Sequence, residues 1–295
     1  MPVIGERPDL DLETVIYATD FSLGSQNAGL YAARLAVHCS AKLLVVHAFT
    51  LSQAAMEVEI DQLLVSQQRE DLKSLLMRKA ALLTANSIEA VPILLEGDPK
   101  DVICNFAEES APTIIVLGTH GGGWLERGVI GSIAEKILRS SRWPSLTVGP
   151  QVPPPTSKAL LFERILLATD FSEAAANAAL YAVTFANVFG ARIDVLNVVQ
   201  PDAIEHPDQL ADIQRRFYAS LDALVPQQAR EFCAPRTFVE VGCAHDQILE
   251  HIKEQASDLL VLGIRKTSHL GMEMRTSRAF QIIVEAKCPV LTIRR

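Results

Sequence analysis

The stretch TIIVLGTHGGGWLERGVIGSIAEKIL, residues 113–138, passes from an apolar run through a glycine-rich loop into a segment that predicts a helix. Residues 113–117 are typical of a buried strand, and the expected helix begins near Ser132. A strand, a glycine loop and a helix N-terminus together form a cradle for an anion, because bare backbone N–H groups and the positive helix end face one point. Glycine allows the close approach of the backbone and positive φ angles. The stretch therefore predicts a phosphate-binding loop.

The spacing of the glycines tells more than their number. Gly118 is followed after two residues by Gly121, and Gly121 is followed after nine residues by Gly131 and Ser132. No Gly-Lys-Ser/Thr follows, so this is not a Walker A loop, and the Rossmann order G-x-G-x-x-G is missing. A second interpretation stays open, in which the glycines serve turns alone and Ser132 forms a helix capping box with Glu135.

The chain repeats itself. The segment VIYATDFS at residues 15–22 returns as ILLATDFS at residues 165–172, at an offset of 150. The offset falls to 145 further on, where residues 114–118 correspond to residues 259–263. A self-match of this length indicates a tandem duplication.

Each half consists of apolar strands alternating with helical segments, which is typical of a parallel sheet covered by helices on both faces. We expect long helical regions at 51–85 and at about 208–232, and the leucines of the first recur near helical spacing. Prolines cannot extend a helix or the interior of a sheet, so the proline-rich segment between the halves predicts a linker. The expected organisation is a first domain at 1–150, a linker at 151–158 and a second domain at 159–295.

Composition describes a globular protein with a substantial core, because 49% of the 295 residues are hydrophobic and 21% are charged. The net charge of -8 argues against a nucleic-acid partner or an anionic membrane surface. The five cysteines show no C-x-x-C and no metal-ligand spacing, which favours buried free thiols in a reducing compartment. The first eight residues contain no apolar signal core, and no apolar stretch reaches the length of a membrane span. We therefore expect a cytoplasmic protein.

The repeat, the two Ala-Thr-Asp turns and the spacing from Gly118 to Ser132 resemble a tandem universal stress protein whose first half is of the ATP-binding type. The resemblance covers nearly all of both halves. It implies two Rossmann-like (flavodoxin-like) α/β domains, each a five-stranded parallel sheet with helices on both faces. It also implies that the two halves pair as a pseudo-dimer within the chain. Ligands in such sheets lie beyond the carboxyl ends of the strands.

The resemblance further implies a ligand, ATP with or without Mg²⁺, and the residues that contact it. In ATP-binding members of the family the turn after the first strand holds adenine and ribose, and the residue after a histidine on the second strand touches adenine through its backbone. These positions correspond here to Ala18, Thr19 and Asp20, and to Ala48 after His47. The phosphate and ribose loop corresponds to Leu117, Gly118, His120, Gly121, Gly131, Ser132 and Ile133.

Two of these residues have alternative interpretations. Asp20 carries a carboxylate at a strand end, where it can accept hydrogen bonds from ribose hydroxyls or the adenine amine, but it can also cap the following helix. His120 can add charge or a hydrogen bond near the phosphates, or it can be a solvated loop residue.

The second half departs from the pattern. Gly263 remains, but Lys266 and Thr276 replace two glycines, and Phe280 replaces Glu135. Side chains at these positions obstruct the approach of the backbone to an anion and disfavour positive φ. We therefore expect the second site to be impaired for ATP. A basic cluster near it is interpreted as a solvated face, with binding of another anion as the alternative; its members are Arg265, Lys266, Arg275 and Arg278.

Three functions remain open. The leading hypothesis is a nucleotide-responsive module of the stress response that holds ATP mainly in its first domain and acts on an unidentified protein partner. The second is a weak nucleotide hydrolase or phosphotransferase that uses Asp20 and His120. The third is an interaction scaffold that binds no nucleotide. No catalytic triad is visible from spacing, and Asp98 fits a turn and helix start better than a catalytic base, so we expect at most slow ATP hydrolysis. Whether two chains form a homodimer stays open.

Overall fold

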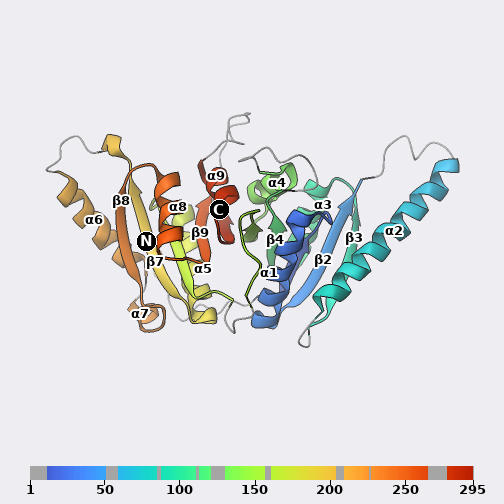
Figure 1. Ribbon diagram of the computed structural model, residues 1–295, viewed down its shortest axis with the longest axis horizontal. Coiled ribbons are helices and arrows are strands. Elements are labelled where there is room, and N and C mark those ends of the chain that lie inside the picture. Colours follow the sequence, from blue (N-terminus) through green and yellow to red (C-terminus); the bar gives the residue numbers. More distant parts are fainter. Residues whose placement is uncertain are drawn as a thin grey trace. The chain divides into compact units, whose positions relative to one another are not determined.

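The computed structural model describes residues 12–50, 59–84, 88–110, 113–120, 130–156, 161–203, 209–225, 227–264 and 278–294. These residues divide into two compact units, the first made of 12–120 and 131–148, and the second of the residues from Gly149 onward together with Ile130. Each unit is an α/β structure in which helices flank a set of strands (Figure 1). The proline-rich segment at 151–156 carries neither helix nor strand. The domain limits at 1–150, 151–158 and 159–295 stay a prediction.

The first unit contains a parallel sheet with the strand order β3-β2-β1-β4-β5. β1, at the centre, is buried along its whole length and pairs with β2 on one side and with β4 on the other. A parallel strand covered on both faces requires apolar residues throughout, which explains the continuous apolar runs of the sequence. The strands are β1 (Thr14–Ala18), β2 (Lys42–Phe49), β3 (Ala90–Glu96), β4 (Thr113–Gly118) and β5 (Ser145–Val148).

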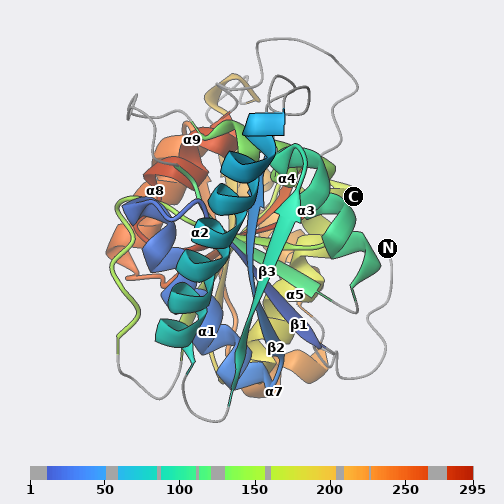
Figure 2. The same ribbon diagram turned by 90° about the vertical axis from the view of Figure 1, so that its right-hand side faces the viewer.

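The helices of the first unit lie in two layers, with α1 packed on α2 and α3 packed on α4. Figure 2 shows α1 and α2 on one side of the strands and α3 on the other. Their bounds are α1 (Leu23–Cys39), α2 (Glu59–Leu83), α3 (Pro99–Glu109) and α4 (Ser132–Ser140). Ser22 caps α1, because its hydroxyl accepts a hydrogen bond from the Ser25 N–H at 3.2 Å. Asp98 caps α3 and accepts from the Lys100 N–H at 2.9 Å, which confirms the helix-start interpretation of this carboxylate.

Helix α2 turns a narrow apolar stripe towards the sheet. Leu76 and Leu83 are buried, whereas their neighbours Leu75 and Leu82 are exposed, so one leucine of each pair points inward. The predicted helical region at 51–85 contains this helix, and its residues 51–58 and 85 lie outside the part of the chain that the structure describes.

The second unit repeats the architecture, with a parallel sheet in the order β10-β9-β6-β7-β8. Its strands are β6 (Arg164–Ala168), β7 (Arg192–Val199), β8 (Arg236–Val241), β9 (Leu259–Ile264) and β10 (Val290–Arg294). Its helices are α5 (Glu173–Phe189), the 3-10 helix η2 (Pro201–Ala203), α6 (Gln209–Leu224), α7 (Gln227–Cys233), α8 (Ala244–Glu254) and α9 (Arg278–Glu285). Five parallel strands with flanking helices are therefore described in each unit, and the predicted fold class is confirmed.

The helical region predicted near 208–232 is two helices, α6 and α7, rather than one. Pro226 stands in the sequence between them, and the residue before a proline is disfavoured in helical conformation, so α6 ends here. No helix in the described ranges is both long enough and apolar enough to cross a membrane.

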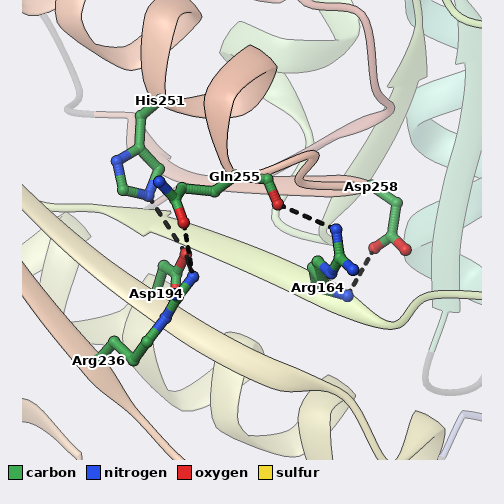
Figure 3. Close-up of polar contacts among 6 residues, drawn as sticks. All are labelled: Arg164, Asp194, Arg236, His251, Gln255 and Asp258. Atoms are coloured by element: carbon green, nitrogen blue, oxygen red, sulfur yellow. Dashed lines mark hydrogen bonds and ion pairs between the residues drawn. The ribbon is translucent and has the colours of Figure 1, made fainter.

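A cluster of charges distinguishes the second unit (Figure 3). Asp194 on β7 is 5% exposed and receives two hydrogen bonds from the Arg236 guanidinium of β8, at 2.8 and 2.6 Å. The Nε2 atom of His251, on α8, lies 3.3 Å from the same carboxylate, and the Gln255 side-chain oxygen accepts from Arg236 at 3.0 Å. At the repeat-equivalent positions the first unit has apolar residues, Leu44, Val91 and Phe106. Charged and polar side chains thus join β7, β8 and α8 in the second unit, at positions where the first unit carries no charge.

All five cysteines are free thiols, as predicted. Cys104, Cys233 and Cys288 are buried, whereas Cys39 and Cys243 are half-buried, so the expectation of buried thiols holds for three of them. Burial raises the pKa of Cys39 and of Cys233 to about 11, which keeps both thiols protonated at neutral pH.

Candidate functional site

The strand ends of the first unit meet at one edge of the sheet. Ala18 pairs with Val46 on β2 and with Leu117 on β4, so the three strands end close together. The Thr19 N–H continues the pairing and donates to the Val46 carbonyl at 2.9 Å. From β1 the chain runs to β2 and β3 on one side and to β4 and β5 on the other, and parallel α/β sheets bind ligands beyond the strand ends at such a switch point.

The turn after β1 is held by its own side chains. The Thr19 hydroxyl accepts from the Phe21 N–H at 3.1 Å, and an Asp20 carboxylate oxygen accepts from the Ser22 N–H at 3.0 Å and from the Ser22 hydroxyl at 2.6 Å. Phe21 has a φ of 63°, in the left-handed region that a phenylalanine rarely adopts. Asp20 is exposed at the strand end, while the N-cap of α1 is Ser22. Asp20 therefore shapes the turn and presents a carboxylate to solvent.

His47 on β2 fastens this turn from the neighbouring strand. Its Nδ1 atom lies 2.7 Å from the Thr19 carbonyl oxygen, and its ring lies 4.4 Å from the Phe21 ring, centroid to centroid. A carbonyl oxygen only accepts hydrogen bonds, so Nδ1 carries the proton and donates. In the second unit Asn197 occupies the equivalent position, and its Nδ2 donates to the Thr169 carbonyl at 2.8 Å.

Burial lowers the pKa of His47 below its ordinary value, and the hydrogen bond to Thr19 and the Asp20 carboxylate oppose the shift without cancelling it. The ring is therefore neutral at pH 7, with its Nδ1 proton engaged at Thr19. Ala48, the next residue, is buried at the end of the same strand.

The glycine at the end of β4 is required by packing. A Cβ on Gly118 would lie 2.9 Å from the Gly24 carbonyl oxygen at the start of α1, and a Cβ on Gly24 would lie 2.8 Å from the His120 carbonyl oxygen. The second unit shows the same close approach, since a Cβ on Gly263 would overlap the Ala174 carbonyl group. Gly118 therefore owes its identity to the close approach of α1, whether or not a ligand is bound.

The two ends of the glycine-rich loop are joined by the backbone. The Gly131 N–H donates to the Thr119 carbonyl at 2.8 Å, which brings the start of α4 to the end of β4. Next to this point the His120 Nδ1 atom lies 2.8 Å from the Thr119 hydroxyl, and the His120 side chain is half-buried. The loop between, residues 121–129 with Gly121, lies outside the described residues.

The capping box of Ser132 and Glu135, the second interpretation of this segment, is not formed. The N-cap of α4 is Gly131, which has no side chain to offer, and Ser132 is the exposed first residue of the helix. Since Ser132 already lies inside the helix, it does not hold the N-cap position that a capping box requires. The Glu135 carboxylate bonds to Arg139 instead, at 2.9 Å. The N-cap residue therefore supplies no side-chain acceptor to the first-turn N–H groups of α4.

The structure thus brings the predicted contact residues to one edge, apart from Gly121, which is not among the described residues. They lie at the ends of β1, β2 and β4 and at the start of α4: Ala18, Thr19, Asp20, Ala48, Leu117, Gly118, His120, Gly131, Ser132 and Ile133. Among the described residues, no group of three or more His, Cys, Asp or Glu side chains is arranged to hold a metal ion.

The turn is repeated in the second unit. The Thr169 hydroxyl accepts from the Phe171 N–H at 3.1 Å, Asp170 accepts from the Ser172 N–H at 2.9 Å, and Phe171 has a φ of 59°. The Phe171 ring stacks on the Phe217 ring of α6, with 5.5 Å between the centroids, whereas its counterpart Phe21 in the first unit packs on His47. The loop after β9, with Lys266 and Thr276, lies outside the described residues, and Phe280 is buried in α9.

Sequence reasoning missed the residues beneath the turn, namely Tyr17, Gly24, Ser25 and Gly29. The signal was present in the repeat, because each of these positions differs between the halves although the surrounding segments match. Their counterparts are Leu167, Ala174, Ala175 and Ala179.

The two units define a tandem protein of parallel α/β domains, whose first unit has a helix N-terminus and a carboxylate at the sheet edge where such folds generally bind ligands. The chain belongs to the universal stress protein family, whose model matches residues 12–149 and 161–294. A universal stress protein of Methanocaldococcus jannaschii is 30% identical over 141 residues, which cover 45% of this chain and 80% of that protein. A universal stress protein of Thermus aquaticus is 30% identical over 138 residues, covering 45% of this chain and all of that protein.

Solved structures match this chain over nearly its full length. The crystal structure of a universal stress protein from Archaeoglobus fulgidus matches with a TM-score of 0.71 at 21% identity, over 96% of this chain and 98% of that one. A putative universal stress protein from Pseudomonas aeruginosa matches with a TM-score of 0.56 at 13% identity, over 97% of this chain and 94% of that one. At these identities the likeness shows the fold.

Proposed function

We propose that the first domain binds ATP at the edge formed by the ends of β1, β2 and β4 and the start of α4, and that the protein is a nucleotide-responsive module of the stress response. The observation that carries the proposal is the hydrogen bond from the Gly131 N–H to the Thr119 carbonyl. It fixes a helix N-terminus without a side-chain cap at the end of β4, and β4 pairs with β1, the strand that leads into the Asp20 turn. An anion at such a helix end is stabilised by the helix dipole and by unsatisfied N–H groups.

In this proposal each predicted residue has a part. The Asp20 carboxylate accepts from the ribose hydroxyls, and the backbone at Ser132 and Ile133 binds phosphate, with the exposed Ser132 hydroxyl as a further donor. His120 and Gly121 border the phosphates. The adenine lies against backbone and apolar surface of Ala18, Thr19, Ala48 and Leu117, and Gly118 keeps the strand end close to α1. Mg²⁺ accompanies ATP as its phosphate counterion.

We further propose that one nucleotide binds per chain. The second domain carries Ala174 where the first has Gly24, and a Cβ at position 24 would meet the His120 carbonyl at 2.8 Å. In the first domain the backbone at His120 comes close to the start of α1. A loop with the same course in the second domain would therefore collide with the Ala174 side chain. Lys266 and Thr276 add side chains to the loop itself.

The test is mass spectrometry of the nucleotide released by heat from freshly purified protein, with its stoichiometry per chain. One intact ATP per chain supports the proposal, and two per chain contradict the distinction between the domains. If neither purified protein nor protein given Mg-ATP retains nucleotide, the interaction scaffold is the better account. Release of ADP, formed at a rate that Asp20→Ala abolishes, would instead identify a hydrolase or phosphotransferase.

The repeat supplies a matched control. Asp20→Asn keeps a side-chain oxygen to accept from Ser22 but removes the negative charge, so the turn is retained while contact with ribose hydroxyls weakens. Asp170→Asn makes the same change at the equivalent turn of the second domain. We expect Asp20→Asn to lower ATP affinity and Asp170→Asn to leave it unchanged, whereas equal effects would argue against binding in the first domain.

The proposal places the protein in the cytoplasm, where ATP is abundant, and assigns the readout of the bound state to a protein partner. Pairing of the two domains within one chain, and of two chains as a homodimer, stay predictions. Sedimentation of the chain with and without Mg-ATP would test the homodimer.

A further inference from the structure

Beneath the turn of the first domain lies a buried network of hydroxyl groups. Tyr17, the fourth residue of β1, is completely buried, and its hydroxyl donates to the Ser25 carbonyl at 2.6 Å. The same phenol oxygen lies 3.2 Å from the Thr19 hydroxyl, which in turn lies 3.0 Å from the Ser25 hydroxyl. The Ser25 hydroxyl donates to the Ser22 carbonyl at 3.0 Å. Since a carbonyl oxygen only accepts, the protons of Tyr17 and Ser25 are both assigned, and the Thr19 hydroxyl is left to donate within the network.

The network joins the two parts of the candidate site from below. Thr19 accepts from the Phe21 N–H and so holds the turn that presents Asp20. Ser25 belongs to the first turn of α1, directly after Gly24, whose carbonyl oxygen forms the surface on which Gly118 packs. Tyr17 therefore touches the segment that positions the carboxylate and the segment that positions the end of β4.

The sequence makes room for this phenol ring. A Cβ on Gly29 would lie 2.8 Å from Tyr17 Cε1 and 2.9 Å from Tyr17 Cζ, atoms of a buried ring that cannot swing aside. Glycine inside a helix is unfavourable by itself, so its presence in α1 needs a packing reason, and the Tyr17 ring provides one.

The second domain has no counterpart of the network. Leu167 replaces Tyr17, Ala175 replaces Ser25 and Ala179 replaces Gly29, and all three are buried. Yet the turn above them has nearly the same geometry, with Thr169 accepting from the Phe171 N–H at 3.1 Å. The turn can therefore form over an apolar core, so the hydroxyl network of the first domain is not required for the turn to form.

We propose that Tyr17 is a positioning residue of the first domain's nucleotide site, which locks the Asp20 turn and the start of α1 in the arrangement that the ligand requires. The inference rests on the proposed function. It gives a reason for the buried hydroxyl network, which distinguishes the first domain from the second in addition to the difference between their loops. Burial raises the pKa of Tyr17, so the phenol keeps its proton at physiological pH and remains a donor to Ser25.

The test compares two variants of the full chain. Tyr17→Phe removes one oxygen atom and keeps the ring. The triple change Tyr17→Leu, Ser25→Ala and Gly29→Ala installs the apolar core of the second domain, which that domain shows to be compatible with the turn. Affinity for ATP is measured by calorimetry, and the unfolding midpoint is measured alongside it. Tyr181→Phe, which removes a phenol hydroxyl from α5 of the second domain, serves as the control.

We expect both variants to bind ATP on the order of tenfold more weakly, and the triple variant to unfold near the wild-type midpoint. The control should bind as the wild type does. Unchanged affinity in both variants would overturn the proposal. If the triple variant does not fold, Tyr17→Phe decides alone, since weaker binding supports a positioning role and equal binding refutes it.

A wild-type chain that binds no ATP contradicts the proposed function, and a second readout then decides the role of Tyr17. Amide hydrogen exchange at Phe21 and Ser22 reports the turn directly, because both N–H groups are bonded to Thr19 and Asp20 side chains. Faster exchange in Tyr17→Phe supports the positioning role, and unchanged exchange refutes it.

Discussion

His47 and Asn197 perform the same task in the two domains with different chemistry. The His47 Nδ1 atom lies 2.7 Å from the Thr19 carbonyl oxygen, and the Asn197 Nδ2 atom lies 2.8 Å from the Thr169 carbonyl oxygen. In each case a side chain on the second strand supplies the donor for a carbonyl at the end of the first strand. The amide fixes the carbonyl without a titratable group, whereas the imidazole adds a ring contact with Phe21 and a proton that depends on pH.

The first prediction follows from that exchange. His47→Ala leaves the Thr19 carbonyl without its donor and should lower the free energy of unfolding by about 1–2 kcal/mol, while His47→Asn should recover much of the loss. Urea unfolding of the three proteins measures the difference. Equal losses in both variants would mean that ring packing on Phe21, rather than the hydrogen bond, is what His47 contributes.

The second prediction concerns pH. Because burial lowers the pKa of His47, the unfolded chain takes up this proton at higher pH than the folded chain does, so stability falls as pH drops from about 6.5 through the lower folded pKa. Wild-type protein should lose more stability than His47→Asn between about pH 7 and pH 5. Thermal unfolding of both proteins across that range checks the sign, and parallel curves would show that His47 does not contribute to the pH dependence.

The third prediction addresses the glycines at the strand ends. Gly118→Ala and Gly263→Ala each place a Cβ under 3.0 Å from the backbone of α1 or α5, which cannot yield as a flexible side chain would. We expect each to destabilise the nucleotide-free protein by about 1–3 kcal/mol, the usual result of overpacking a tight contact. Chemical denaturation without ligand is the measurement. Gly118→Ala with full stability and impaired ATP binding would show instead that this glycine serves the ligand.

The fourth prediction concerns the charged cluster of Figure 3. Asp194→Leu removes the acceptor shared by Arg236 and His251 and should cost about 1–3 kcal/mol, at the low end for a buried ion pair because Arg236 is half exposed. Completing the exchange with Arg236→Val and His251→Phe reproduces the apolar residues of the first domain and should restore most of the stability. Urea unfolding measures the stability of the single and the triple variant. A triple variant less stable than Asp194→Leu would show that Arg236 and His251 stabilise the domain even without their carboxylate partner.

The fourth prediction also has a consequence at acidic pH. Burial alone would raise the pKa of Asp194, but hydrogen bonds from His251 and Arg236 outweigh it and lower the pKa below its ordinary value. A carboxylate with a lowered folded pKa stabilises above its unfolded pKa of about 3.9 and loses that contribution as pH falls below it. The stability gap between wild type and Asp194→Leu should therefore be constant near neutral pH and shrink below about pH 4.

The architecture was predictable because its evidence is local or repeated. The apolar run at 15–18 and its counterpart at 165–168 are buried, and the matching sequences of the two halves predict the same parallel sheet in each. Asp98 before Pro99 indicates a helix start by itself, since an acidic N-cap followed by proline has few other uses. The grouping of Asp20, Ala48 and Gly118 at one edge then follows from parallel strand ends.

Other features depend on contacts between distant residues, which spacing does not reveal. α4 begins at Ser132, as expected, but its N-cap is Gly131, whose N–H bonds to the Thr119 carbonyl, so Ser132 lies inside the helix and does not cap it. The role of Gly118 depends on Gly24, which lies far back in the chain. Tyr17 looks like one more core residue of a strand until its hydroxyl is seen to bond to the Ser25 carbonyl.

The fit between Tyr17 and Gly29 also restricts the order in which the two halves could have diverged. While a tyrosine stands at position 17, a methyl group at position 29 collides with its ring. The tyrosine must therefore change before the glycine can. Exchange of the tyrosine for leucine removes the ring, and an alanine can then follow; the second domain has this pair as Leu167 and Ala179, both of them buried. Starting from the tyrosine-glycine pair, the path to the leucine-alanine pair runs through leucine with glycine. Starting from the other pair, alanine must become glycine before a tyrosine can enter, so divergence in either direction passes through the same leucine-glycine intermediate.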